Sequence, residues 1–214
     1  MSQENKALAG MIGPAMFALI IVVLILVQYD FMVQLGWHPI RRSDVPWPSG
    51  LALGPLGGLQ VANFVLFGFM LIAFAVGIHR RVAGGGRGSR VGPALLILAG
   101  VSMVLAGFKT DPDISGGPQT WHGLIHGLAY LLFVFSLLPS FFFLGWRLRR
   151  DPFWRGYSLY TLITGVLYAL LFFRPEPVAF YPFLALILVW IEVMVIRLRS
   201  IVGDASLQQP ARVG

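Results

Sequence analysis

Long apolar runs alternate with short polar segments along most of this chain. Six runs approach the roughly 20 apolar residues that a helix needs to cross a bilayer. They cover residues 9–33, 57–79, 92–108, 121–146, 156–173 and 179–198. The pattern predicts an all-α bundle of six transmembrane helices, and the short loops between them predict a single membrane domain over residues 1–214.

The composition favours the same interpretation. Of the 214 residues, 57% are hydrophobic and only 12% are charged, whereas ordinary soluble domains have about 25% charged residues. Such a chain cannot cover a water-facing surface with polar groups. The first run is longer than the apolar core of about 7–15 residues in a signal peptide, so we expect it to remain as an uncleaved span. Cysteine is absent, which excludes disulfides and thiolate chemistry.

The basic residues gather at the ends of the apolar runs. If all six runs cross the membrane, 12 of the 16 Lys and Arg residues fall on one side and 4 on the other. Those four are Arg41, Arg42, Lys109 and Arg174. The positive-inside rule then predicts a multi-pass protein of the cell membrane with both termini in the cytoplasm. No basic stripe interleaved with aromatics is present, so nucleic acid is not an expected partner despite the net charge of +7.

Polar side chains recur at the predicted outer ends of five of the six runs. They are Asp30, Gln60, Asn63, Lys109, Asp111, His122, His126 and Arg174. Isolated polar groups are costly in lipid, so their convergence predicts a polar pocket open to the extracytoplasmic side. The longest outer loop, residues 34–56, contains Trp37, Trp47 and several prolines. These residues suit a rigid cap over that side.

His122 and His126 are four residues apart, so they share one helix face with Tyr130. Without a metal, His126 is a candidate general base, and Asp111 is its orienter or the acid. The alternative is structural. Gly123 and Gly127 form the GxxxG pattern of closely packed membrane helices, and the histidines could bond to Asp111 or to loop carbonyls.

The two histidines also raise the question of a metal. A zinc site needs three or four ligands, and the further ligand would have to be Asp111, Asp113 or Asp30. Position 123 is Gly where the zinc-binding HExxH pattern has Glu. We therefore assign no metal ligand, and a divalent metal such as zinc stays an alternative cofactor.

A second polar pattern lies in the last two runs. Tyr157, Thr161, Thr164 and Tyr168 fall on one helical face, which predicts a hydroxyl stripe turned toward the bundle. Glu192 is an ionisable residue inside the last run and is a functional candidate for that reason. We predict that Glu192 bonds to this stripe. If the protein is a transporter, Glu192 would be its inner gate.

Short motifs also carry a resemblance to a known family. They are the Asn63–Gly68 segment, Phe108 with Asp111, and the pair His122 and His126. In this order they resemble the bacterial and archaeal membrane family catalogued as domain of unknown function 998. The resemblance covers most of the chain. It implies six helices and an important outer region, but no specific activity.

Three functional interpretations remain open. In the first, the pocket binds a membrane lipid or another lipophilic small molecule, and the protein is an acid–base or hydrolytic membrane enzyme. Its candidate catalytic residues are Asp30, Asp111, His122 and His126, and its candidate binding residues are Gln60, Asn63, Tyr130, Arg174 and Glu192. The second is a small-solute or proton-coupled transporter, and the third is a non-catalytic structural or sensory subunit. The GxxxG pattern also leaves a homo-oligomer open.

Overall fold

The structure, a computed structural model, describes residues 3–40, 47–82, 90–113, 115–174 and 179–207. All regular elements in these ranges are helices. In chain order they are α1 (Gln3–Val27), α2 (Tyr29–Gln34), the short 3-10 helix η1 (Ser49–Leu53), α3 (Gly57–Arg81), α4 (Val91–Leu105), α5 (Trp121–Leu148), α6 (Arg155–Phe172) and α7 (Phe180–Leu207). Each of the six apolar runs contains a helix, which confirms the all-α prediction.

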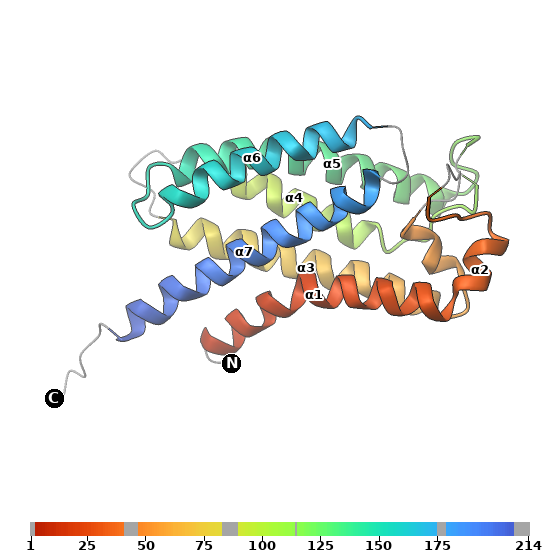
Figure 1. Cartoon of the computed structure of the whole chain (residues 1–214), viewed down its shortest axis with the longest axis horizontal. Coiled ribbons are helices and arrows are strands. Elements are labelled where there is room, and N and C mark those ends of the chain that lie inside the picture. The colour runs from red at the N-terminus through yellow and green to blue at the C-terminus, as the bar shows by residue number, and fades with distance from the viewer. Residues whose placement is uncertain (1–2, 41–46, 83–89, 114, 175–178, 208–214) are drawn as a thin grey trace.

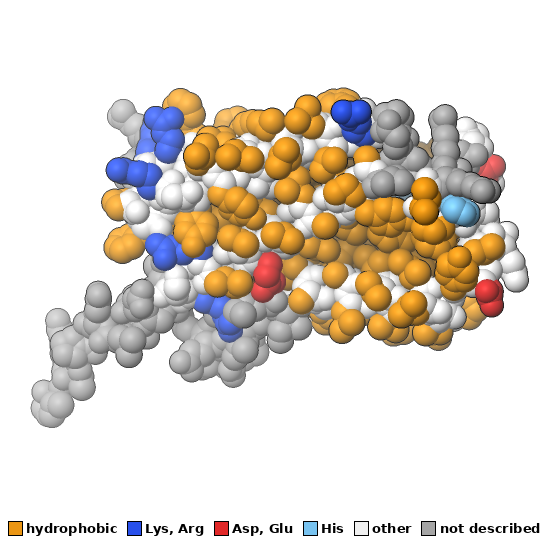
Figure 2. All heavy atoms as spheres, in the orientation of Figure 1, with side chains coloured by type: hydrophobic (Ala, Val, Ile, Leu, Met, Phe, Trp, Pro, Cys, Tyr) orange, Lys and Arg blue, Asp and Glu red, His pale blue; other side chains and the backbone are white. Residues whose placement is uncertain are grey.

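The outer surface of the helices is suited to lipid. Three of the described helices are long and apolar enough to cross a membrane: α3, α5 and the part of α7 from Phe180 to Ser200. The apolar stretch Gly13–Val27 of α1 and the whole of α4 are shorter. Large apolar side chains point outward all along the molecule, and Leu26, for example, is 73% exposed. Hydrophobic side chains cover most of the face in Figure 2. A water-soluble protein rarely exposes so continuous an apolar surface, so the chain is a membrane-like helical protein.

The six long helices form a closed ring in chain order. Each packs against the next, from α1 through α3, α4, α5 and α6 to α7, and α7 packs back against α1. Glycines allow the closest approach, between α3 and α4: a Cβ at Gly68 would lie 2.6 Å from the Gly100 carbonyl oxygen. Backbones that meet in this way are typical of helix pairs in membranes. The start of α1 and the end of α7 lie at one end of the ring, and α2 lies at the other (Figure 1).

Aromatic side chains fill the lumen of the ring near its middle. We call Phe74, Phe141, Tyr168 and Trp190 the aromatic plug, and all four are buried. The Trp190 ring lies 4.8 Å from the Phe141 ring and 5.9 Å from the Phe74 ring, measured between centroids. Its Nε1 donates a hydrogen bond of 3.2 Å to Thr161 Oγ1. The hydroxyl stripe of α6 therefore faces the bundle, as predicted.

The predicted bond between Glu192 and this stripe is wrong. Trp190 and Met194 are four residues apart on one face of α7, and both meet Thr161. Residue 192 is two positions from each, so its side chain points roughly 200° away from that face. Glu192 Oε2 has no hydrogen-bond partner among the described residues, and the Thr164 hydroxyl donates within its own helix.

The first apolar run is two helices rather than one, because the chain breaks at Gln28. The Gln28 side chain turns inward, where Nε2 donates to the Leu51 carbonyl at 3.3 Å and Oε1 accepts from the Leu56 amide at 2.8 Å. These bonds hold η1 against the end of α1. After α2, Gly36 adopts a φ of 96°, and the turn brings Trp37 into the interior.

Charge is unevenly distributed between the two ends of the ring. Most Lys and Arg side chains on the face in Figure 2 gather at the end opposite α2, and a His side chain lies near the α2 end. This is the distribution on which the topology prediction rests. Arg41, Arg42, Arg87 and Arg212, which that prediction counted, lie outside the described residues.

Candidate functional site

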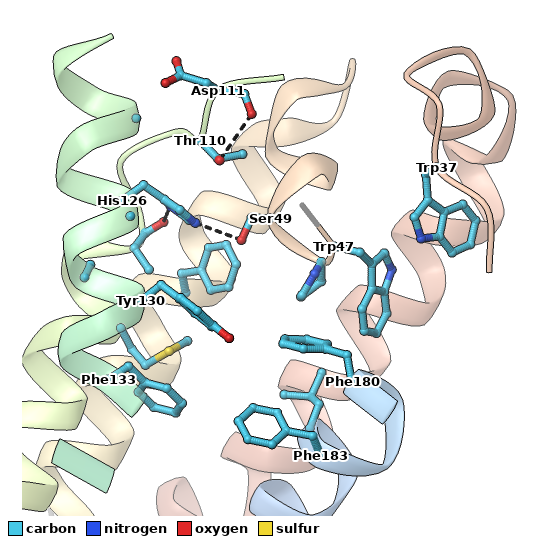
Figure 3. A pocket seen from close by; sticks show the side chains of 18 of the residues that line it. Trp37, Trp47, Ser49, Thr110, Asp111, His126, Tyr130, Phe133, Phe180 and Phe183 are labelled. Atoms are coloured by element: carbon cyan, nitrogen blue, oxygen red, sulfur yellow. Dashed lines mark hydrogen bonds between the residues drawn. The ribbon is translucent and has the colours of Figure 1, made fainter. Parts of the chain in front are cut away.

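A cavity of about 660 Å³ lies inside the ring at the end that carries α2 and η1. Its walls come from α1, α3, α4, α5 and α7. Most of its lining is apolar and includes Phe17, Phe64, Phe67, Phe133, Phe180 and Phe183. Figure 3 shows Phe133, Phe180 and Phe183 below the polar side chains of Ser49, Thr110 and His126. Small-molecule sites commonly have about 300–1,000 Å³ and this mixture of apolar walls and few polar groups.

The described parts of the cap predicted for residues 34–56, which are residues 34–40 and 47–56, lie over this cavity. Both Trp37 and Trp47 line it. The Trp47 ring packs against α7, with centroid distances of 5.8 Å to Phe180 and 4.6 Å to Tyr181. The cap therefore joins the beginning of α7 to the end of α1.

The cavity reaches the side of the ring between α1 and α7. Phe17 of α1 and Leu184 and Ile187 of α7 belong to its lining. In Figure 1, α7 and the second half of α1 diverge toward the α2 end. Figure 2 shows the apolar surface hollowed between these helices. The hollow faces the surface that is suited to lipid.

His126 is a buried polar group of the cavity wall. Its Nδ1 lies 2.9 Å from the Ala106 carbonyl oxygen and 2.7 Å from that of Phe108. Carbonyl oxygens only accept hydrogen bonds, so Nδ1 carries the proton and Nε2 of the neutral ring is an acceptor. The Ser49 hydroxyl, 2.9 Å from Nε2, therefore donates to it. The two carbonyls follow the end of α4, so His126 also satisfies groups that the helix leaves without partners.

Asp111 is buried at the rim, but its carboxylate points away from the cavity (Figure 3). Oδ1 accepts from the Thr120 hydroxyl at 2.6 Å, and Oδ2 accepts from the Gln119 amide at 2.8 Å and the Thr120 amide at 3.3 Å. The bond from the Thr120 hydroxyl and then that from the Gln119 amide lower the pKa of Asp111. Asp111 therefore anchors the start of α5, and its hydrogen bonds do not orient His126.

His122 belongs to the same junction between α4 and α5. Its Nδ1 lies 2.9 Å from the Lys109 carbonyl oxygen and 3.0 Å from Thr120 Oγ1. Thr120 in turn caps α5 by accepting from the Gly123 amide at 3.0 Å. Both histidines thus bond to carbonyls that follow α4, the arrangement that the structural interpretation described. Only His126 also lines the cavity.

The GxxxG glycines have two different roles. A Cβ at Gly123 would collide with the Asp111 carboxylate, so glycine is needed there for the loop to approach α5. A Cβ at Gly127 would meet nothing within 4 Å, and Gly127 lines the cavity. The pattern therefore does not pack two helices together here. Gly123 allows the Asp111 carboxylate to approach α5, and Gly127 borders the open cavity.

The remaining candidate residues lie elsewhere, except Tyr130. Its ring lines the cavity, and its hydroxyl points inward (Figure 3). Outside the lining are Asp30, Gln60, Asn63, Arg174 and Glu192. Asp30 and Arg174 are exposed.

Gln60 and Asn63 form a buried pair behind the cavity wall. Asn63 Nδ2 donates to the Phe17 carbonyl at 3.1 Å and to Gln60 Oε1 at 3.4 Å. The bond to Phe17 connects α3 to α1. The Asn63 side chain therefore holds two helices together and does not line the pocket, although the sequence had led us to expect that it would.

The described residues do not fit a zinc site. In the parts of the chain that the structure describes, no three His, Asp or Glu side chains come together to hold a metal ion. Nδ1 of each histidine faces a carbonyl, and Asp111 is occupied by amides and a hydroxyl.

Polar residues at this end that the sequence did not single out include Gln28, Ser49 and Thr110. Ser49 lies 77 positions before its partner His126, so no periodicity connects them. The available signals were local: Gln28 interrupts an apolar run, and Ser49 stands in the Pro-Ser-Gly sequence of a Trp- and Pro-rich loop.

Comparison with known proteins gives the family. Residues 11–199 match the family model described as "Protein of unknown function (DUF998)", and the chain belongs to this family. No curated protein matches the chain. No solved structure matches it either.

Proposed function

We propose that this member of the DUF998 family binds a membrane lipid or a similar lipophilic molecule in the cavity beneath its cap. In this proposal all six long helices cross the cell membrane, both termini are cytoplasmic, and the cavity opens in the outer half of the bilayer. The basic end of the ring supports this orientation. The start of α1 and the end of α7 lie at the same end of the ring, which supports an even number of membrane crossings.

The observation that carries the proposal is the division of the cavity into apolar walls and one polar end. Aromatic side chains from α1, α3, α5 and α7 can enclose a hydrocarbon chain. Ser49, His126 and Tyr130 can meet the polar part of the same molecule. The hydroxyl of Tyr130 makes no hydrogen bond to the described residues, and a polar group in an apolar site is stabilised by finding a partner. A ligand with a polar group at one end supplies that partner.

The hollow between α1 and α7 favours the membrane as the source of the ligand. A molecule that enters there passes from lipid into the cavity without crossing water. The cap closes the route along the axis, since Trp47 packs against Phe180 and Tyr181. A lipophilic ligand therefore has an apolar path into the site.

Transport through the ring is less well supported than binding. From Phe67 to Phe74 on α3, and from Phe183 to Trp190 on α7, the chain advances seven residues, or about 10 Å. Over that distance the lumen changes from cavity to the buried aromatic plug. A solute could pass only if the plug moved, whereas binding requires no such change.

The test compares lipids that remain with the protein after purification. Gly127→Leu places a side chain in the cavity, and Gly58→Leu is the matched control because a Cβ at Gly58 also meets nothing within 4 Å, outside the cavity. We expect mass spectrometry to find a lipophilic molecule with the wild type and with Gly58→Leu. Gly127→Leu should lose at least nine tenths of it.

Equal retention by all three proteins would mean that the lipid lies on the outer surface. That result would refute binding in the cavity. A folded wild type that retains no lipophilic molecule would refute it as well, because the proposal expects the ligand to stay in the cavity through purification.

A further inference from the structure

We propose that Ser49 and His126 form a nucleophile–base pair that cleaves a carboxylic ester of the bound lipid by acyl transfer through Ser49. The inference rests on the proposed function, because the cavity must hold the ester next to the pair. It adds a reaction and a substrate class, an acyl ester with a long apolar chain.

The first support is the direction of the hydrogen bond between the two side chains. His126 Nδ1–H is directed at two carbonyls, which leaves the lone pair of Nε2 for the Ser49 hydroxyl at 2.9 Å. This distance is within the reach that a general base needs to take a proton from a nucleophile. In triads of this kind a third group holds the imidazole in the correct tautomer. The carbonyls of Ala106 and Phe108 do so here.

The second support is that both members of the pair are held in place. Ser49 begins η1, and the two hydrogen bonds of Gln28 fix the segment from Leu51 to Leu56 against α1. His126 is 8% exposed and fixed to the end of α4. A pair that is fixed before the substrate binds loses little entropy when it reacts. Gln28 already holds η1, so the Ser49–His126 bond is not the main attachment of the cap.

The third support is a free donor beside the pair. Tyr130 follows His126 by one turn of α5, and its hydroxyl points into the cavity (Figure 3). It makes no hydrogen bond to the residues that the structure describes. A hydroxyl so placed can donate to the oxyanion that forms when an ester carbonyl is attacked. The apolar walls below it can hold the acyl chain.

The reaction is balanced with water as the second substrate. Ser49 Oγ forms a bond to the ester carbonyl carbon while its proton moves to His126 Nε2. The tetrahedral intermediate collapses, the bond between the carbonyl carbon and the alcohol oxygen breaks, and the leaving alcohol takes the proton from Nε2. Water then attacks the acyl–Ser49 ester with His126 as the base. This step releases the carboxylic acid and restores the hydroxyl.

The test uses a long-chain alkyl fluorophosphonate on the purified full-length protein in detergent. The reagent phosphonylates activated serines with loss of fluoride, and peptide mass spectrometry locates the adduct. We expect one adduct, at Ser49, that is absent from Ser49→Ala. Ser115→Ala is the matched control, since Ser115 also lines the cavity but bonds to Asp113 rather than to a histidine. It should label as the wild type does.

A second variant tests the base. In His126→Gln the side-chain amide can still donate to the carbonyls after α4, but it cannot accept the serine proton. The labelling rate of Ser49 should fall about 100-fold or more, and hydrolysis of 4-nitrophenyl decanoate should fall with it. If this variant does not fold, the comparison of Ser49→Ala with Ser115→Ala still decides whether Ser49 is the nucleophile.

The outcomes separate this inference from lipid binding. A wild type that retains lipid but gains no adduct at Ser49 overturns the acyl transfer and leaves the binding proposal intact. Equal labelling rates in the wild type and a folded His126→Gln overturn the role of His126. A third outcome is that Ser49 is labelled but Gly127→Leu retains as much lipid as the wild type. That outcome would refute the cavity as the lipid site.

Discussion

The cavity and the aromatic plug occupy the same lumen, yet one is open and the other is filled. Both have aromatic side chains from α3, α5 and α7. They differ in two respects. α6 contributes Tyr168 to the plug but no residue to the cavity lining, and α5 lines the cavity with the small residues Gly127 and Ala129 as well as with aromatic ones. Aromatic content therefore does not decide whether the lumen is filled. The cavity lies where α6 adds no side chain and α5 presents small residues.

Trp190→Ala should have the largest effect on stability. Replacing a fully buried Trp by Ala leaves a void in close-packed surroundings and costs about 3–5 kcal/mol. Phe180→Ala is the matched change in the cavity wall, where the side chain is half-buried and already borders open space, and it should cost about 1 kcal/mol. Denaturant unfolding in detergent measures both. Similar costs would mean that the two halves of the lumen are packed alike.

The two GxxxG glycines should respond in opposite directions to the same substitution. Gly123→Ala forces a methyl group against the Asp111 carboxylate, and such overpacking typically costs about 1–3 kcal/mol. Gly127→Ala meets open space and should stabilise α5 by up to about 1 kcal/mol, since Ala favours a helix over Gly. Thermal unfolding of both variants provides the measurement. If Gly127→Ala were the more damaging change, the space beside it would not be open.

The anchor of α5 should make stability depend on pH in one direction. Hydrogen bonds from Thr120 and Gln119 lower the pKa of Asp111 in the folded protein below its ordinary value of 3.8. Its contribution is therefore complete above that value and is lost as the pH falls through the lower, folded-state pKa.

Asp111→Asn tests this dependence. The variant should lower the Tm by several degrees at pH 7, and the difference from the wild type should shrink as the pH falls below about 3.8. Asp113→Asn is the comparison variant. The Ser115 hydroxyl and amide also lower the pKa of Asp113, but Asp113 is exposed and its hydrogen bonds to the described residues stay within its own turn, so its substitution should lower the Tm less. A Tm difference between Asp111→Asn and the wild type that stays the same at all pH values would show that the charge of Asp111 does not matter.

Sequence reasoning located the helices because apolar run length is a local property. All six runs contain helices, and the family resemblance to domain of unknown function 998 is confirmed by the match over residues 11–199. The same reasoning placed Asp111, His122 and His126 at one junction because they are close in the sequence. It could not show which groups each of them contacts.

The contacts that define the cavity are between distant segments. Ser49 meets His126 because the cap folds over the end of the ring, and Gln28 reaches η1 because the chain breaks after α1. Neither follows from periodicity. Asp30 and Arg174 were grouped with the pocket by their expected depth in the membrane, but depth does not fix the direction in which a side chain points around a helix. Both are exposed outside the cavity.

Thr161→Val should have the smallest effect, and it tests whether the hydroxyl stripe has more than a packing role. The substitution keeps the shape of the side chain and removes the acceptor of the Trp190 Nε1 hydrogen bond. Hydrogen bonds between membrane helices average about 0.6 kcal/mol, so the free energy of unfolding should fall by about that amount. Lipid retention should be unchanged, because Thr161 lies beside the plug and outside the cavity lining. Loss of bound lipid with such a small change in stability would connect the plug to the cavity. It would also revive the hypothesis of a pathway through the ring.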